Sequence, residues 1–201
     1  MSGLVAPHGG KLINRKGDRP SNIERFETVS LSPRELADLD MISSGALSPL
    51  EGFMGSSDYI RVVNEMRLED GTPWALPVCL AVKEAPKGDT IALTDQKGKP
   101  LAVLDIEEVF SYDRENEAQQ CFRTTDASHP GVARLYDQGE IYVAGKVTVF
   151  ERQAPPFPKL AKDPVETRSL FSERGWSRIV GFQTRNPIHR AHEYLTKCAL
   201  E

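Results

Sequence analysis

The sequence has few cysteines, no long apolar run and no signal for export. Its three cysteines, Cys79, Cys121 and Cys198, lie far apart and form no Cys-x-x-Cys pair. This spacing is typical of reduced thiols in a reducing compartment and excludes a disulfide framework. No stretch approaches the roughly 20 apolar residues of a membrane span, and the first twenty residues lack the apolar core of a signal peptide. The sequence therefore predicts a cytoplasmic protein without a membrane partner.

An excess of positive charge is also missing. The 201 residues include 25 Lys and Arg against 29 Asp and Glu, which gives a formal net charge of −4. Dedicated nucleic-acid binders usually carry a basic face, so no nucleic-acid partner is expected. The length is sufficient for one or two domains with a sizeable core. Any site for an anion must therefore be local.

The most informative stretch lies at residues 176–201. Its apolar run at 178–183 is typical of a buried parallel strand, and Pro187 ends the run. Asn186 followed by Pro187 is typical of a helix start, because Asn can cap the free N–H groups and Pro fits the first helical position. Apolar residues then recur at helical spacing. The pattern predicts a strand, a tight loop at 184–186 and a helix.

The predicted loop has the side chains of an anion site. The N-terminus of a helix beside the carboxyl end of a strand favours negative charge. Arg185 could hold an oxyanion through two parallel hydrogen bonds, and His189 and His192 are expected on one face of the first helical turns. Each of these residues alone is more typical of an ordinary surface. Together with the loop they predict a phosphate site.

Zinc is the other ligand to consider for a His-x-x-His pair on a helix. The helical zinc motif spaces its histidines four apart with a glutamate between them, whereas here Arg190 and Ala191 intervene. An arginine beside a dication is unfavourable. We therefore expect phosphate contact and no protein-bound metal.

Most of the chain before residue 150 is predicted to be β-rich. Alternating apolar residues are typical of antiparallel strands, and Ser, Asp and Pro at three places indicate helix starts. The expected strands are 74–82, 90–94, 101–110 and 141–149, and the expected helices are 32–44, 58–66, 113–121 and 128–136. Phe53 and Met54, which are flanked by glycines, are expected to fill a core. Short strands with small inserted helices favour a compact, partly closed β-barrel.

A proline-rich linker at 153–159 marks a domain boundary. After it, the capping box at Asp163-Pro164-Val165-Glu166 predicts a helix that ends at Gly175. The predicted domains are residues 1–158, which are β-rich, and residues 159–201, the first α-β-α portion of a second domain. An open parallel sheet needs more strands than this portion has, so we expect a fragment of a longer protein.

Two stretches resemble the ATP sulfurylase (sulfate adenylyltransferase) family. The eleven residues 183–193, Gln-Thr-Arg-Asn-Pro-Ile-His-Arg-Ala-His-Glu, are similar to that family's nucleotide-binding motif without a departure. Residues 45–54, Gly-Ala-Leu-Ser-Pro-Leu-Glu-Gly-Phe-Met, resemble a segment near the start of its N-terminal domain. The resemblance implies a PUA-like β-barrel followed by the beginning of an α/β Rossmann-like nucleotidyltransferase domain. The family's Gly-Arg-Asp-His segment, which completes its site, has no match in this chain.

The resemblance implies that a sulfate oxygen attacks the α-phosphorus of ATP, giving adenosine 5′-phosphosulfate and pyrophosphate, with Mg²⁺ accompanying the ATP. Sulfate needs no deprotonation, so catalysis depends on positioning and charge neutralisation. By similarity, Gln183 and Arg185 hold the sulfate. The implied catalytic residues are Thr184, Arg185, Asn186, His189 and His192, and the implied ATP contacts are Gln183, Thr184, Asn186, His189 and His192. The full-length protein is expected to be a homo-oligomer, and this chain alone is expected to be inactive.

Two other classes of function stay open. One is another nucleotidylyltransferase, or a domain like that of an aminoacyl-tRNA synthetase, which shares the His-x-x-His helix but uses a different acceptor. The other is a non-enzymatic module whose PUA-like domain binds RNA or a partner protein. A steep salt dependence of RNA binding would support the second alternative, and the acidic composition speaks against it.

Overall fold

The computed structural model describes residues 4–200 and divides into two compact units. The first runs from Ala6 to Val165, and the second contains the described chain from Glu166 onward together with Leu4 and Val5. Within residues 4–200, no helix combines the length and the apolar character needed to cross a membrane. Cys79, Cys121 and Cys198 form no disulfide with one another.

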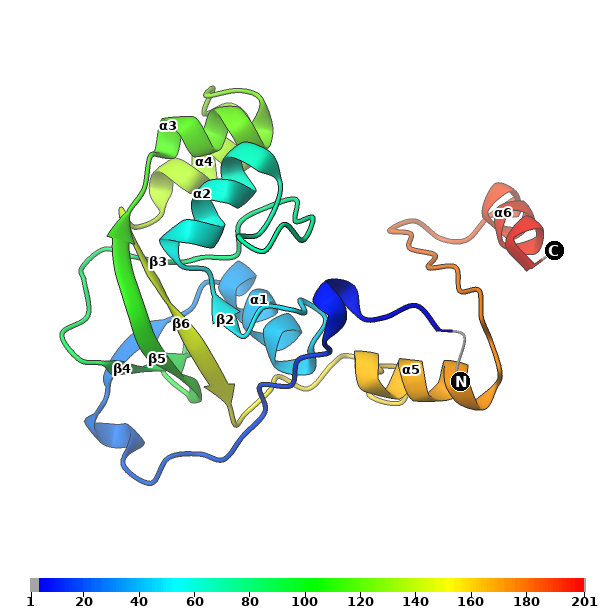
Figure 1. Cartoon of the computed structure of the whole chain (residues 1–201), viewed down its shortest axis with the longest axis horizontal. Coiled ribbons are helices and arrows are strands. Elements are labelled where there is room, and N and C mark those ends of the chain that lie inside the picture. Colours follow the sequence, from blue (N-terminus) through cyan, green and yellow to red (C-terminus); the bar gives the residue numbers. More distant parts are fainter. Residues whose placement is uncertain (1–3, 201) are drawn as a thin grey trace. The chain divides into compact units, whose positions relative to one another are not determined.

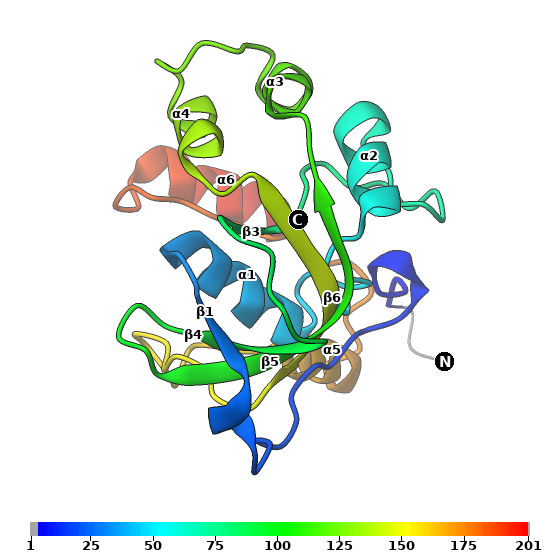
Figure 2. The same ribbon diagram turned by 90° about the vertical axis from the view of Figure 1, so that its left-hand side faces the viewer.

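A six-stranded sheet forms the centre of the first unit (Figures 1 and 2). Its long strands β5 and β6 pair antiparallel along their length, and the register shifts between Ile106 and Glu108. The strand β3 pairs with β6, on the side away from β5, as the short β2 does. The strands in order across the sheet are β1 (Glu27–Ser30), β4 (Thr90–Thr94), β5 (Pro100–Ser111), β6 (Ile141–Val149) and β2 (Gly52–Phe53), with β3 (Leu80–Val82) beside β6.

Four short helices accompany this sheet. They are α1 (Pro33–Ser44), α2 (Ser56–Glu65), α3 (Arg114–Glu117), which continues as a π-helical turn over Ala118–Phe122, and α4 (Pro130–Asp137). The helices α2, α3 and α4 gather near one end of the long strands, whereas α1 lies apart from them (Figures 1 and 2). Two 3-10 turns, His8–Gly10 and Ile23–Arg25, precede β1.

The helix starts follow from the capping residues that the sequence predicts. Ser32 Oγ accepts a hydrogen bond from the Glu35 N–H, and Glu35 Oε2 accepts one from the Ser32 N–H, so both halves of the capping box form. Gly45 ends α1 in the left-handed conformation, with a φ of 84°. Asp113 Oδ1 caps the start of α3 by accepting a hydrogen bond from the Asn116 N–H at 3.0 Å.

Most predicted strands are confirmed, but the predicted strand at 74–82 is largely wrong. Only Leu80–Val82 pairs as a strand. Pro77 lacks an N–H, and the residues on its two sides are held by single backbone hydrogen bonds, from the Trp74 N–H to Met66 O before it and from the Met54 N–H to Val78 O after it. The strands β1 and β2 were not predicted, and β1 pairs parallel with β4, although only antiparallel pairs were expected.

The Gly45–Met54 segment shapes the core. Phe53 and Met54 are buried there, with 3% and 2% exposure, as predicted. A Cβ added to Gly52 would lie 1.8 Å from the Gly145 carbonyl oxygen, so only glycine permits β2 and β6 to approach this closely. Ser48 Oγ accepts from the Ile13 N–H at 2.9 Å and donates to Gly45 O at 2.7 Å. This stretch therefore fixes the N-terminal arm against the domain and has a structural role.

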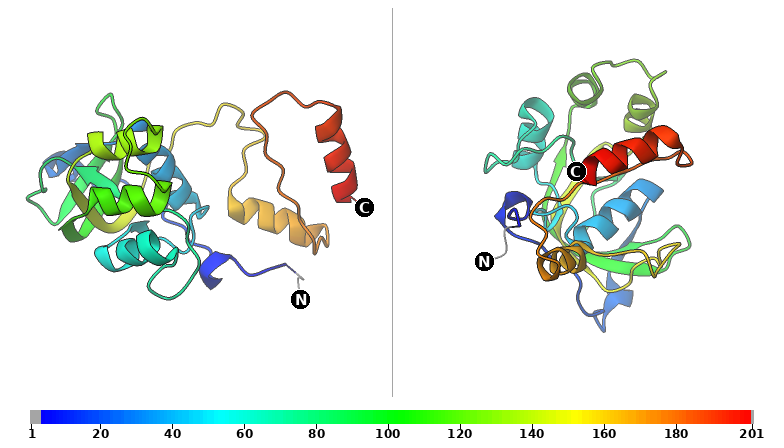
Figure 3. Two further views of the ribbon diagram at one scale, coloured as in Figure 1. Left: turned by 90° about the horizontal axis from the view of Figure 1, so that it is seen from above. Right: turned by 90° about the vertical axis from the view of Figure 1, so that its right-hand side faces the viewer.

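The second unit contains two helices and no strand among its described residues. The helix α5 (Pro164–Glu173) begins where the capping box predicts, and Gly175 follows it with a φ of 65°. The helix α6 (Arg190–Leu200) follows an extended segment (Figures 1 and 3). The predicted strand at 178–183 is wrong: these residues are irregular and exposed, because a strand needs a neighbour to pair with and the described residues supply none.

Candidate functional site

The candidate site is the loop 183–189 at the start of α6. Thr184 Oγ1 accepts a hydrogen bond from the Asn186 N–H at 3.1 Å and donates one to Asn186 O at 3.2 Å. These two hydrogen bonds form a local turn at Thr184–Asn186, so the chain changes direction before the helix begins. The predicted helix start at Asn186 and Pro187 is therefore wrong, since α6 begins at Arg190.

His189 stands in the capping position instead. Its carbonyl oxygen accepts a hydrogen bond from the Glu193 N–H at 3.0 Å, and its Nδ1 accepts one from the Ala191 N–H at 3.3 Å. His192 Nδ1 accepts in turn from the His189 N–H at 3.4 Å. With both Nδ1 atoms accepting, the ring protons lie on Nε2, where they can be donated to a ligand.

The two imidazole rings are brought together, as their three-residue spacing predicts. Their centroids lie 4.0 Å apart, and Phe182 packs edge-on against His192 at 5.8 Å. His192 is half-buried, whereas His189 is exposed. The contact with Phe182 was not expected, because the predicted strand would have placed that side chain in a sheet. Here Phe182 instead limits the positions that the His192 ring can take.

Gln183 and Arg185 lie exposed on the same loop. Among residues 4–200, neither side chain has a hydrogen-bonding or ionic partner. Both are therefore available to a ligand without breaking an existing contact. The structure places all six predicted residues within one loop and helix start. It brings the two histidines into direct contact, but it shows no direct contact of Gln183 or Arg185 with them.

The charges near the loop favour an anion. Arg185 and Arg190 are both exposed there. Glu193, the acidic residue of the first turn of α6, has its carboxylate paired with Lys197 one turn further along the helix. The positive end of the helix dipole adds to the positive potential of the two guanidinium groups. Within residues 4–200, no group of three or more His, Cys, Asp or Glu side chains could hold a metal ion.

Comparison with known proteins identifies both parts of the chain. Residues 5–152 match the PUA-like domain family, which confirms the predicted class of the first part, and residues 158–201 match the ATP-sulfurylase family. The sulfate adenylyltransferase of Symbiobacterium thermophilum is 51% identical over 100% of this chain and 54% of its own length. That of Synechococcus sp. (strain JA-3-3Ab) is 49% identical over 98% of this chain and 53% of its own. The chain therefore belongs to the ATP sulfurylase family, as its motifs predicted.

Two further proteins that this chain matches have APS kinase in their names. A probable bifunctional SAT/APS kinase 2 of Sorangium cellulosum is 47% identical over 99% of this chain and 36% of its own length. The structure of a hexameric APS kinase from Thiobacillus denitrificans superimposes with a TM-score of 0.74 and 29% identity, covering 98% of this chain and 37% of that one. The chain spans about half the length of the sulfate adenylyltransferases it matches. The predicted boundary after residue 158 stays a prediction.

Proposed function

We propose that this chain is part of a cytoplasmic sulfate adenylyltransferase, which converts ATP and sulfate into adenosine 5′-phosphosulfate and pyrophosphate. The observation that carries the proposal is the loop 183–189 at the start of α6, which presents Gln183 and Arg185 without partners among the described residues and is followed by the contacting pair His189 and His192. This loop lies within the part of the chain that matches the ATP-sulfurylase family. The hexameric neighbour supports a homo-oligomeric assembly for the whole protein.

The roles of the residues follow from their chemistry. Arg185 presents a planar pair of donors that matches two sulfate oxygens, and Gln183 adds a neutral donor on the same loop. Thr184 and Asn186 would contact the α-phosphate. The Nε2–H groups of His189 and His192 would donate to the β- and γ-phosphates as negative charge moves to the leaving pyrophosphate. Catalysis then consists of positioning and charge neutralisation, with no proton removed from sulfate.

Magnesium would reach this site with ATP. The loop offers imidazoles and guanidinium groups, which are poor ligands for Mg²⁺, and the Glu193 carboxylate is paired with Lys197. The residues present therefore suit a Mg²⁺ ion held by the phosphates of ATP and by water. The ion would supply additional neutralisation of phosphate charge. The side chains of the loop would bind the remaining phosphate oxygens.

The test is sulfate-dependent pyrophosphate release from ATP and magnesium, measured on this chain and on its natural extension to the length of its relatives. We expect activity in the longer chain only. In that chain, Arg185→Lys should lower kcat/KM for sulfate by roughly 100-fold with little change in ATP affinity, because lysine keeps the charge and loses the two parallel donors.

The matched control is Arg178→Lys, an exposed arginine of the same segment outside the motif, which should leave activity unchanged. Normal turnover of the Arg185 variant would contradict its role at sulfate. Pyrophosphate release by neither chain, with ATP still bound by the longer one, would indicate a different acceptor.

A further inference from the structure

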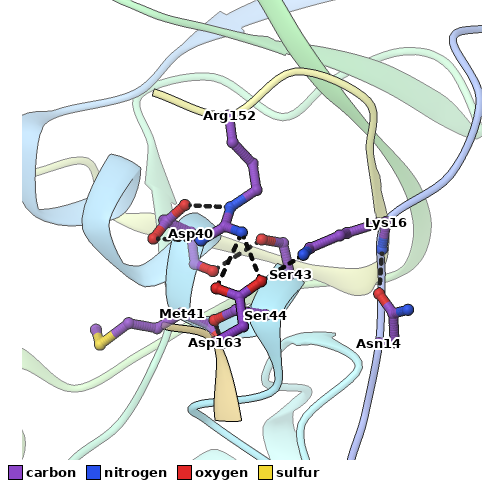
Figure 4. Close-up of polar contacts among 8 residues, drawn as sticks. All are labelled: Asn14, Lys16, Asp40, Met41, Ser43, Ser44, Arg152 and Asp163. Carbon is purple, nitrogen blue, oxygen red and sulfur yellow. Dashed lines mark hydrogen bonds and ion pairs between the residues drawn. The ribbon is translucent and has the colours of Figure 1, made fainter. Parts of the chain in front are cut away.

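A cluster of four charged side chains joins three distant segments of the first unit (Figure 4). Arg152, which follows β6, donates from Nε to Asp40 Oδ1 at 2.6 Å and from Nη2 to Asp40 Oδ2 at 3.1 Å. Its Nη1 donates to the two oxygens of Asp163 at 3.1 and 2.9 Å. Lys16 Nζ also donates to Asp163 Oδ2. We call Lys16, Asp40, Arg152 and Asp163 the linker clamp.

Three members of the linker clamp stand on fixed backbone. Asp40 lies within α1, and Arg152 comes three residues after the end of β6. Lys16 lies in a segment that bridges to Val149, with the Gly17 N–H donating to Val149 O at 3.0 Å. Asn14 Oδ1 accepts the Lys16 N–H at 3.1 Å and further fixes this segment (Figure 4).

Asp163 is the one member of the linker clamp that follows an irregular segment, and its ion pairs with Lys16 and Arg152 fix its position. It lies at the end of the irregular linker 153–162, in which Phe157 and Leu160 are 72% and 79% exposed, and it directly precedes α5. An extended linker of this length could span roughly 35 Å. The two ion pairs instead close it into a loop whose far end is fixed beside Arg152.

The geometry makes these contacts stronger than ordinary surface pairs. The Arg152–Asp40 contact is bidentate, and the side chains of Arg152 and Asp163 are 31% and 18% exposed. Burial alone would raise the pKa of Asp163, yet the hydrogen bonds from Lys16 and Arg152 hold that pKa below its usual range. The two positive and two negative charges of the clamp balance, so it can be partly buried without a net charge.

We propose that Arg152 is a positioning residue, which fixes the first residues of α5 on the PUA-like domain and thereby supports the reaction of the ATP-sulfurylase segment that follows. On this proposal Arg152 does not contact the substrates and acts only through the linker. The existence of the linker clamp is inferred from hydrogen bonds within the first unit. Its effect on turnover rests on the proposed function.

Hydrogen exchange tests the clamp directly, in this chain and in its natural extension. Arg152→Ala should increase exchange roughly 10-fold at the hydrogen-bonded amides of Leu160 and Ala161 and at those of α5, because local opening no longer breaks charge-assisted hydrogen bonds. Arg152→Lys, which keeps the charge but loses the fork of donors that pairs bidentately with Asp40, should give an intermediate increase. The control is Lys99→Ala, which removes the exposed ion pair with Glu151 beside Arg152 without touching the linker. Unchanged exchange in the Arg152→Ala variant would overturn the clamp.

Kinetics on the extended chain then test positioning. We expect Arg152→Ala to lower kcat/KM for pyrophosphate release several-fold, Arg152→Lys to recover part of the loss, and Lys99→Ala to leave it unchanged. Increased exchange with unaltered kcat/KM would show that the clamp holds the linker but does not position the catalytic segment, and would overturn that part of the proposal. An inactive extended chain would refute the proposed function and with it the catalytic effect, while exchange would still decide whether the clamp exists.

Discussion

The two units of this chain differ in what becomes of their apolar side chains. In the first unit, Leu80, Leu104 and Val143 are fully buried, whereas in the second unit Val180 and Leu195 are 66% and 57% exposed. Neither α5 nor α6 has a buried residue. The apolar patterns of the two regions are similar in kind, so the difference lies in the neighbours. A pattern predicts which face of an element will be buried, but burial needs a partner surface.

The strands show the same lesson. Thr90–Thr94 forms a strand because β1 and β5 lie on either side of it and satisfy its backbone hydrogen bonds. The segment 178–183 has an equally strand-like pattern, but no strand is described beside it. Its backbone therefore stays irregular, although its residues are suited to a buried strand.

The largest expected effect comes from the close approach of β2 and β6. Gly52→Ala places a Cβ against the Gly145 carbonyl oxygen, 1.8 Å away, and backbone on both sides must move. We expect the free energy of unfolding to fall by about 3 kcal/mol or more. Urea unfolding followed by circular dichroism measures this loss.

Two glycine controls sharpen the comparison between the units. A Cβ at Gly88, also in the first unit, meets its nearest atom only at 3.5 Å, and one at Gly181 in the second unit meets nothing within 4 Å. Both alanine variants should change the unfolding free energy by no more than about 0.5 kcal/mol. An equally mild Gly52→Ala variant would mean that β2 does not pack against β6 in solution.

A pair of leucines compares the two units with the same substitution. Leu104→Ala leaves a cavity at a position with 0% exposure and should cost about 3 kcal/mol of unfolding free energy. Leu195→Ala removes a side chain that is 57% exposed and should cost no more than about 0.5 kcal/mol. Urea unfolding of both variants gives the two values. Similar losses of unfolding free energy would contradict the difference in burial between the two units, because they would mean that Leu195 lies in a packed core.

These differences also explain how much could be predicted from the sequence. In the first unit, signals that act within a few residues were reliable: the helices predicted to begin at Ser32 and Asp113 both form, each with a side-chain cap at that residue. Short elements that depend on distant partners were missed, among them β1 and β2. The reason is that the pairing energy comes from residues far away in the sequence.

The candidate site divides in the same way. The three-residue spacing correctly predicted that His189 and His192 lie together. The helix start was placed at Asn186, because its sequence favours a cap, but the hydrogen bonds of Thr184 form a turn there first. The linker clamp had no local signal at all. Asp40 and Arg152 are 112 positions apart, and only the folded chain brings them together.

The smallest expected effect concerns a buried carboxyl group of the first unit. Glu117 is 6% exposed, and its Oε2 accepts hydrogen bonds from the hydroxyl groups of Tyr59 at 2.8 Å and Tyr142 at 3.0 Å. Burial raises the pKa of Glu117 above its ordinary value of 4.5, although the two tyrosine hydrogen bonds act in the opposite direction. The first unit can therefore bury a titratable group because it supplies partners for it.

The raised pKa has a definite consequence for stability. As the pH rises above 4.5, the unfolded chain releases the Glu117 proton before the folded chain does, so this group's contribution to stability falls until the pH passes the folded pKa. Glutamine cannot ionise. The stability of Glu117→Gln relative to the original chain should therefore increase from pH 4 towards pH 8, as measured by urea unfolding at each pH. Glu115→Gln, an exposed residue of the same helix, should show no such trend. A constant difference between Glu117→Gln and the original chain would mean that Glu117 is solvated in solution, and the burial that distinguishes the first unit would not extend to α3.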